Sequence, residues 1–289
     1  MVQVMRKIRY LMRYLVPLSQ EAIRIIILYK NWFEIVSNRF GGNKDTTEVT
    51  LRSGIKYKIH PSPRSTDIDL IHEIHSENIY QVQKGDISDN SVVIDIGAQI
   101  GVFSVFAATQ AENVSVYSFE PEPENFQFLV RNIEINHLDN KIHPINQAVS
   151  NVGTPKKLIR SAASVSAHSL FPGKFTAGEI RDSIKVDCTT LTDVFRKYAI
   201  KKCRILKLDC EGEEYNILLS MPDNILAKVV KIVIEYHDGL TEHTHNDLGE
   251  FLRAKNFEVE VREERSFPKF TVGFLQAVNK SSKAANAAK

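Results

Sequence analysis

Two carboxylates stand at the ends of apolar runs that are typical of buried parallel strands. Asp95 follows Val92-Val93-Ile94, and Glu120 ends a run that begins at Val116. In a doubly wound sheet the carboxyl ends of such strands face one crevice, where an acidic residue can accept both hydroxyls of a ribose. Each residue alone also fits a structural role, a helix N-cap or turn for Asp95 and a surface strand end for Glu120.

Glycines follow the first of these carboxylates. Gly97 lets the backbone turn sharply and approach a ligand closely, and Gly101 can admit a helix against the strand. A dinucleotide site would require G-x-G-x-x-G at this point, and that pattern is absent. Asp95 precedes the first glycine instead, and a carboxylate there suits a ligand that carries an ammonium group and no phosphates. A nicotinamide dehydrogenase is therefore disfavoured.

A second group of ionisable side chains stands at the ends of two later strand-like runs. Lys207 and Asp209 are two positions apart, so both point to the same face of their predicted strand. Glu211 follows just beyond that strand, and Glu235 and His237 repeat the arrangement on the next one. Ligands of open α/β sheets bind outside the carboxyl ends of the strands, so these side chains are expected to converge beside the first site.

Each member of this second group also has a structural interpretation. Lys207 and Asp209 can form a purely structural ion pair, and Glu211 can cap the helix that follows it. Glu235 and His237 can be strand-end polar residues without chemistry. A divalent cation held by these three carboxylates and the histidine is possible on ligand type, but the sequence does not favour it.

The elements that must position these residues are short β-rich runs alternating with helices from residue 91 onward. This rhythm predicts an α/β fold: a doubly wound, mostly parallel, Rossmann-like sheet of about seven strands with the last one antiparallel. A helix is predicted from Pro123, because the apolar residues that follow recur at helical spacing. The predicted strands are Val92–Ile96, Val114–Glu120, Ile142–Val149, Ile205–Asp209, Lys231–His237, Phe257–Arg262 and Thr271–Val278.

The chain divides into four predicted regions. Residues 1–45 form a basic and aromatic helical segment, and residues 46–90 form a β-hairpin around Ser53-Gly54 followed by a helix over Ile68–Gln83. Residues 91–279 form the ligand-binding catalytic domain, and residues 280–289 are a disordered tail. Within the domain, residues 150–185 show no strong periodicity and are interpreted as an insertion on the acceptor side. His168 lies in this insertion, either as a plain loop residue or closing over a substrate.

Charge limits the partners that the chain is expected to bind. The 37 basic residues nearly balance the 35 acidic ones, so no bulk field points to nucleic acid. Residues 1–40 are an exception, with seven basic side chains against Glu21 and Glu34. Basic and aromatic residues at helical spacing can dock on an anionic membrane surface. We favour the alternative that these helices pack on the core or on a second subunit.

Cysteine and hydropathy patterns bear on location. Three cysteines, at 188, 203 and 210, have no metal-ligand spacing and suit a reducing cytoplasm. The longest uncharged apolar run near the N-terminus, residues 25–29, is too short for a signal peptide or a membrane span. A cytoplasmic location is expected, with peripheral contact at the inner membrane surface as the alternative.

Five segments form an ordered pattern along the chain. They are Val93–Gly101, Phe119-Glu120-Pro121 with Asn125-Phe126 and Asn132, Ala148–Asn151 before Gly153, Thr189–Asp193, and Leu206–Glu214. The first is shared by many methyltransferases, whereas Lys-x-Asp-x-Glu-Gly in the last is more specific. On these segments, residues 48–278 approximately resemble the FkbM-type family of S-adenosylmethionine-dependent O-methyltransferases. The sequence departs from the family at Gln99, where Asn is common.

The resemblance implies S-adenosylmethionine as the cofactor and an O-methyl acceptor. An acceptor hydroxyl must lose a proton as it attacks, so a base is needed within hydrogen-bond reach, and Asp209 or His237 could serve. Lys207 could pair with Asp209 or stabilise the developing alkoxide. The catalytic set is completed by Glu211 and Glu235. The residues expected at the cofactor are Asp95, Gly97, Ala98, Gln99, Gly101, Glu120, Pro121, Asn125 and Ala148.

The expected function is methylation of a sugar hydroxyl in a glycan or glycosylated metabolite, because the family works largely on hydroxyl or carboxyl groups of glycans and natural products. The alternatives are a non-catalytic binding module with the same fold, and a methyltransferase for a different small-molecule acceptor. The intact motif residues argue against the non-catalytic alternative. A nucleic-acid methyltransferase would normally show a basic stripe, and the chain beyond residue 40 is slightly acidic.

Overall fold

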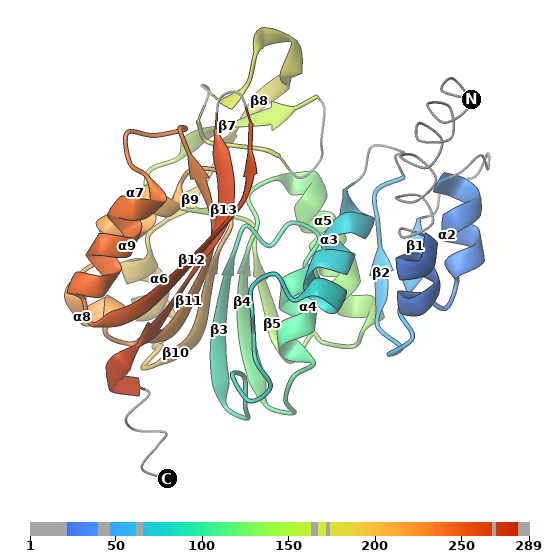
Figure 1. The fold of residues 1–289 in the computed structure, drawn as a ribbon, viewed down its shortest axis with the longest axis horizontal. Coiled ribbons are helices and arrows are strands. Elements are labelled where there is room, and N and C mark those ends of the chain that lie inside the picture. The colour runs from blue at the N-terminus through green and yellow to red at the C-terminus, as the bar shows by residue number, and fades with distance from the viewer. Residues whose placement is uncertain are drawn as a thin grey trace, which may run out of the picture.

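The protein is described here by a computed structural model that covers residues 22–39, 47–61, 66–162, 167–171, 174–267 and 270–282. Most of the basic N-terminal segment, and the part of the predicted disordered tail after residue 282, lie outside the described residues. At the centre is a seven-stranded sheet in the order β12-β13-β11-β10-β3-β4-β5 (Figure 1). Its strands are β3 (Ser91–Ile96), β4 (Val114–Phe119), β5 (Ile142–Ile145), β10 (Cys203–Leu208), β11 (Val229–Asp238), β12 (Phe257–Ser266) and β13 (Thr271–Asn279).

The directions of the strands confirm the predicted fold class. Strands β5, β4, β3, β10 and β11 pair in parallel, as the long crossovers between them require. Strand β13, the last in the sequence, runs antiparallel to both of its neighbours, β11 and β12. The sheet is therefore mostly parallel and Rossmann-like.

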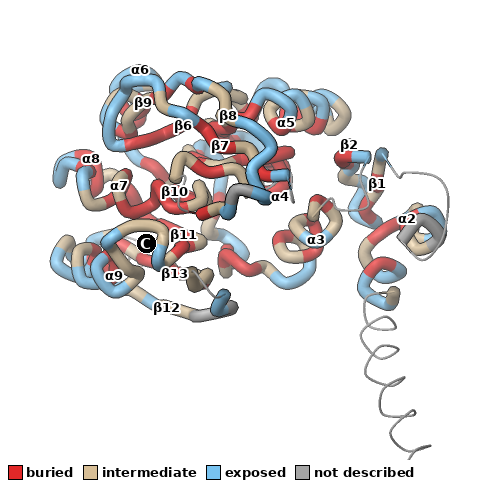
Figure 2. Tube along the Cα trace, turned by 90° about the horizontal axis from the view of Figure 1, so that it is seen from above, coloured by how far each residue is buried: buried red, intermediate tan, exposed pale blue. Residues whose placement is uncertain are grey.

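Two hydrophobic cores lie on opposite faces of this sheet. Val93 and Ile205 belong to one core, and the next residues along the same strands, Ile94 and Leu206, belong to the other. Figure 1 shows one group of helices on each side of the sheet, and Figure 2 shows the buried segments gathered in the central strands. The first core is covered by α4 (Val102–Ala108) and α5 (Pro123–Ile135), and the second by α6 (Leu191–Lys197), α7 (Glu214–Leu219), α8 (Asp223–Leu226) and α9 (His245–Ala254).

Helix α5 begins where the sequence predicts it. Pro123 occupies its first turn, where the missing N–H costs nothing. The Glu122 carboxylate accepts the backbone N–H of Asn125, at 2.8 Å from N to Oε2, and so caps the helix. Leu129 and Ile133 are buried against the sheet, as their helical spacing predicts. The helix therefore holds Glu122 and Asn125 at the carboxyl end of β4.

The predicted hairpin is also present, in β1 (Glu48–Thr50) and β2 (Lys56–Lys58), which pair antiparallel. Asn132 of α5 joins it to the domain: its Oδ1 accepts the Lys58 N–H at 2.6 Å, and its Nδ2 donates to the Ile100 carbonyl at 2.8 Å. Asn132 is fully buried, so these bonds fix the hairpin against the glycine turn.

The described part of the N-terminal segment packs on this hairpin. Residues 22–28 are helical and α2 spans Trp32–Arg39. Ile25 and Tyr29 are fully buried, whereas Ile27 and Phe33 are 67% and 72% exposed. In the described part of the chain, no helix has both the length and the apolar content needed to cross a membrane. Contact with a membrane surface stays a prediction.

The helix predicted over Ile68–Gln83 is shorter than expected. It comprises α3 (Asp67–His72) and one π-helical turn, η1 (Glu73–Glu77). Asn78 then adopts a left-handed conformation with φ of 50°, which ends the helix. The chain leaves the helical path here, and Tyr80 turns toward the end of β10, where its hydroxyl donates to Asp209.

Two further elements differ from the predictions. The single strand predicted over Ile142–Val149 is two strands, β5 and the short β6 (Ala148–Val149), because the chain leaves the sheet at Asn146, whose amide donates to the Glu120 carbonyl at 2.8 Å. Residues 150–185, where the sequence indicates no regular structure, contain β7 (Lys156–Ser161) and the start of β8 (Ile180–Val186), which pair antiparallel. β6 pairs with β9 (Cys188–Thr189).

Candidate active site

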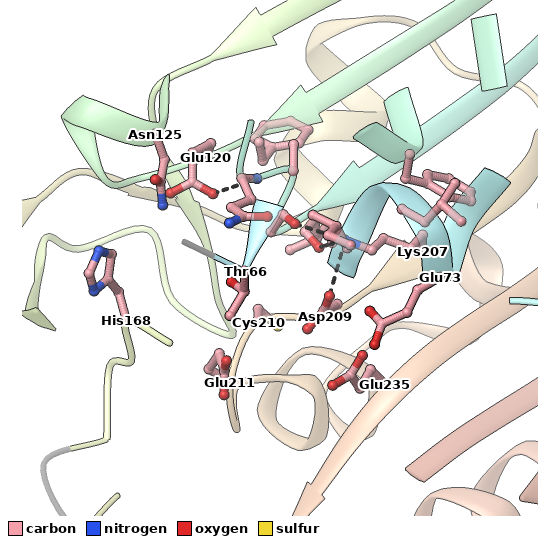
Figure 3. Close-up of a pocket in the computed structure, with 18 of the residues that line it drawn as sticks. Thr66, Glu73, Glu120, Asn125, His168, Lys207, Asp209, Cys210, Glu211 and Glu235 are labelled. Carbon is pink, nitrogen blue, oxygen red and sulfur yellow. Dashed lines mark hydrogen bonds and ion pairs between the residues drawn. The ribbon is translucent and has the colours of Figure 1, made fainter. Parts of the chain in front are cut away.

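A cavity of about 630 Å³ lies at the carboxyl ends of β3, β4 and β10, within the size range of small-molecule sites. Figure 3 shows Glu120 and Asn125 together on one side of it, and Glu73, Asp209 and Glu235 gathered on another. The predicted site residues that line it are Gly97, Ala98, Gln99, Glu120, Pro121, Asn125, Ala148, Lys207, Asp209, Glu211 and Glu235. Three others, Asp95, Gly101 and His237, lie behind its wall.

Glu120 is held in place by two backbone donors. Its Oε2 accepts the Gln99 N–H and its Oε1 accepts the Glu122 N–H, each at 2.8 Å from nitrogen to oxygen. A carboxylate has about four lone-pair positions, so two remain for the hydroxyls of a ligand. Burial raises the pKa of Glu120 to about 7, although these two hydrogen bonds lower it. A ligand that donates hydroxyls would stabilise the ionised form.

The two glycines of the turn make room for protein backbone and for a helix. Gly97 has φ of 74°, and a Cβ there would lie 1.8 Å from the Asp209 carbonyl oxygen. Gly101 has φ of 87°, and its Cβ would lie 2.5 Å from Leu129 Cδ1 of α5. The predicted close approach at Gly97 therefore includes the end of β10. The sequence predicts that Gly101 admits the helix that follows it, Val102–Ala108, whereas the contact in the structure is with α5.

Asp95 pairs with Lys207 behind the cavity wall. Its carboxylate is fully buried, with Oδ2 accepting the Ser104 hydroxyl at 2.6 Å and Oδ1 lying 3.1 Å from Lys207 Nζ. The same ammonium donates to the Gly97 carbonyl at 2.8 Å. Burial lowers the pKa of Lys207, but the charges of Asp95 and Asp209 outweigh burial and raise it. Lys207 is therefore a fixed cation beneath the glycine turn, and direct contact of Asp95 with a ligand stays a prediction.

Asp209 and Glu235 face the cavity from the ends of β10 and β11, with side chains 21% and 23% exposed. Asp209 Oδ2 accepts the Tyr80 hydroxyl at 3.0 Å and lies 3.6 Å from Lys207 Nζ. Burial raises the pKa of Asp209, with the Lys207 charge opposing the shift. Burial and the Asp209 charge hold the pKa of Glu235 well above its usual value. Both carboxyls therefore hold a proton more tightly than exposed carboxyls do.

His237 lies between two carboxylates behind this pair. Its Nδ1 is 3.0 Å from Glu214 Oε1, and its Nε2 is 3.1 Å from Glu211 Oε2. Burial lowers the pKa of His237, but the two carboxylates outweigh it and hold the pKa well above its usual value. The charges of Lys174 and His237 outweigh burial in the same way and depress the pKa of Glu211. In this arrangement both ring nitrogens of His237 face carboxylates.

Several residues of the site carry no local sequence signal. Tyr80 comes from an irregular segment and meets Asp209 only in the fold. Glu214, the first residue of α7, accepts the N–H groups of Cys210 and Gly212 in the preceding turn at 2.9 and 2.8 Å. The alternative role of Glu211 as a helix cap is not observed, because the N-cap residue of α7 is Glu213 and no side chain caps it. His168 lines the cavity, and its Nδ1 accepts the Ser161 N–H at 3.0 Å. Burial lowers the pKa of His168 to about 4, which leaves it neutral.

A model of the methyltransferase FkbM domain matches residues 95–259, more than half of the chain. The chain belongs to the FkbM methyltransferase domain family. It is therefore a methyltransferase of a family that depends on S-adenosylmethionine. The resemblance stated for the five sequence segments is confirmed.

The relatives of this methyltransferase are distant. The chain is 26% identical over 242 residues to AMB antimetabolite synthetase AmbE of Pseudomonas aeruginosa, a match that covers 68% of the chain and 11% of that protein. It is 23% identical over 221 residues to 31-O-demethyl-FK506 methyltransferase FkbM of Streptomyces tacrolimicus, covering 68% of the chain and 84% of that enzyme. A crystal structure of methyltransferase FkbM from Methylobacillus flagellatus aligns with a TM-score of 0.44 at 15% identity, covering 71% of this chain and 47% of that one.

Proposed function

We propose that this methyltransferase transfers a methyl group from S-adenosylmethionine to a hydroxyl of a sugar, in a glycan or a glycosylated metabolite. The observation that carries the proposal is the pair of carboxyls, Asp209 and Glu235, at the cavity end away from Glu120. A hydroxyl can donate to these groups and must lose a proton as it reacts. An acceptor carboxylate would need no base and would be repelled by them. The relative from Streptomyces tacrolimicus is named for an O-demethyl compound, which agrees with an oxygen acceptor.

The residues on the Glu120 side fit the cofactor. The free lone pairs of Glu120 suit the ribose hydroxyls, and Pro121, Asn125 and Ala148 line the cavity around them. The turn at Gly97 lacks the G-x-G-x-x-G pattern that binds phosphates. This agrees with S-adenosylmethionine, which contains no phosphate group. When bound, S-adenosylmethionine supplies a methyl group activated by a sulfonium. The fixed charge of Lys207 beneath the turn is offset by Asp95 and Asp209, so the wall presents no net repulsion.

Asp209 is the base that the geometry favours. It lines the cavity, and burial raises its pKa, which makes the ionised carboxylate a stronger base. His237 lies behind the wall and is paired on both nitrogens, so it suits a positioning role for Glu211. The Tyr80 hydroxyl, which donates to Asp209 Oδ2, orients the carboxylate toward the acceptor. Neutral His168 lines the same cavity and is a candidate contact for the sugar.

The test combines cofactor binding with analysis of the product. Calorimetry should show micromolar binding of S-adenosylmethionine and S-adenosylhomocysteine and none of NAD. Asp209→Asn should keep cofactor affinity within about threefold but lose methyl transfer about 100-fold or more, as expected when a general base is removed. Labelled methyl groups on a panel of glycans and glycosylated metabolites should survive mild alkali, because methyl ethers are stable to it. Alkali-labile product would identify carboxyl esters and overturn the hydroxyl proposal. Absence of cofactor binding would support the non-catalytic alternative.

A further inference from the structure

Three side chains beside the cavity form a set that could hold a metal ion. One ligand atom from each of Asp209, Glu235 and His237 lies within 4.8 Å of the other two. A cation placed among them can reach all three at ordinary coordination distances, about 2.0 to 2.6 Å. Two of the three line the cavity, so further coordination positions face the space where an acceptor binds. Acidic groups alone would not indicate a site, and the histidine makes this set different.

His237 is supported from behind in the manner of a metal-binding histidine. Its Nδ1 lies 3.0 Å from Glu214 Oε1, and its Nε2 lies 3.1 Å from Glu211 Oε2 and 3.8 Å from Glu235 Oε1. A cation that binds Nε2 would take the place of the proton on this nitrogen. Glu214 is itself fully buried and is fixed by the N–H groups of Cys210 and Gly212. Histidines that ligate metals almost always donate their second nitrogen to a carboxylate or carbonyl in this way, which fixes the tautomer and the orientation of the ring.

The charges around the site leave room for a cation. Asp209 and Glu235 are like charges that approach each other, and Glu235 has one ion-pair contact among the described residues, at 3.8 Å to His237. In the same part of the fold the carboxylates outnumber the cations: Asp95, Asp209, Glu211, Glu214 and Glu235 against Lys174, Lys207 and protonated His237. A divalent ion would reduce this excess of negative charge.

We infer that Asp209, Glu235 and His237 form a binding site for one divalent cation, of the type that accepts both oxygen and imidazole ligands, such as Mn²⁺. Binding itself does not depend on the proposed function. Its role does rest on it: a cation facing the cavity would coordinate neighbouring hydroxyls of a sugar and make the reacting one more acidic. The cation would then make the acceptor proton easier to lose, and Asp209 would accept it.

The experiment measures metal binding without turnover. The full chain is freed of metal with a chelator and titrated with Mn²⁺, and the free ion is followed by electron paramagnetic resonance. We expect one ion per chain, with binding weakened at least tenfold in Glu235→Gln. Glu214→Gln, which alters the support of His237 and one of the hydrogen bonds to the Cys210 and Gly212 N–H groups, should weaken binding about 10- to 100-fold. Glu242→Gln is the matched control, because its side chain is 89% exposed and lies outside the site.

Because Glu235 is partly exposed, Glu235→Gln is expected to keep the fold. The unfolding midpoint of this variant and its affinity for S-adenosylhomocysteine report whether the fold is intact. No stoichiometric Mn²⁺ binding by the wild type, or equal binding by wild type and Glu235→Gln, would overturn the inference. Mn²⁺ binding without cofactor binding would keep the metal site and defeat the proposed function. Cofactor binding without Mn²⁺ binding would overturn the metal site and leave the proposed function standing.

Discussion

Glu120 should give the chain a stability that depends on pH. Its side chain is 6% exposed, and burial raises its pKa from 4.5 to about 7. Between these values the folded chain holds a proton that the unfolded chain releases. The contribution of Glu120 is therefore fully present below pH 4.5 and is lost as the pH rises through about 7. A carboxyl placed to bind a ligand thus destabilises the ligand-free protein in its ionised form.

The size of the effect follows from the shift. A rise from 4.5 to about 7 corresponds to about 3 kcal/mol of unfolding free energy. Glu120→Gln removes the titration. An amide cannot accept from both the Gln99 and Glu122 N–H groups, so the variant also loses a hydrogen bond, but that loss is nearly the same at every pH. The difference in unfolding free energy, wild type minus variant, should fall by about 3 kcal/mol between pH 4 and pH 8.5.

Urea unfolding followed by circular dichroism, without cofactor, measures this difference. The contributions of groups that titrate in both proteins cancel in the difference of their unfolding free energies. Glu124→Gln is the control, because the Glu124 side chain is 53% exposed, and its difference from wild type should stay flat. A flat difference for Glu120→Gln as well would refute the reasoning. Calorimetry adds a second readout: cofactor affinity should rise with pH up to about 7 in the wild type and lose this dependence in the variant.

Two further predictions concern packing. Gly97→Ala should cost about 3 kcal/mol of unfolding free energy or more, because its Cβ would lie 1.8 Å from the Asp209 carbonyl oxygen. Gly85→Ala, with φ of 90° and no atom within 4 Å of its Cβ, isolates the cost of positive φ and should lose about 1 to 2 kcal/mol; equal losses in urea unfolding would contradict the steric account. Ile25→Ala should cost about 2 to 5 kcal/mol and Ile27→Ala less than about 0.5, because Ile25 is fully buried and Ile27 is 67% exposed. If Ile27→Ala instead selectively lost co-sedimentation with anionic vesicles, the result would favour contact of the N-terminal segment with a membrane surface over its packing on the core alone.

The local sequence determined the frame of the site. Apolar runs that end in Asp95 and Glu120, with Gly97 and Gly101 after the first, specify a strand, a turn and a helix whatever surrounds them. These signals act between neighbours in the chain, so they can be read without the fold. The same holds for Pro123 at the start of α5, and for Lys207 and Asp209 on one face of β10.

Where the local sequence signal is weak, the predicted elements differ from the structure. The helix over Ile68–Gln83 was predicted too long, because the left-handed Asn78 that ends it satisfies no periodic rule. The pairing of β7 with β8 joins segments about twenty residues apart, and strand pairing at that distance leaves little trace in either segment. Glu211 is a possible helix cap in the sequence, but in the structure it pairs with Lys174 and His237, and no side chain caps α7.

Only the tertiary structure decided which charged groups meet. Asp95 and Glu120 look equivalent in the sequence, yet Lys207 covers the first and leaves the second on the cavity. His237 looks like a free base until Glu211 and Glu214 are found on its two nitrogens. Protonation and ligand preference depend on distances of 3 to 4 Å and on burial, and these arise when strands far apart in the chain are brought together. The sequence determined the candidate residue types of the site, and the order of the strands in the sheet determined which of them became partners.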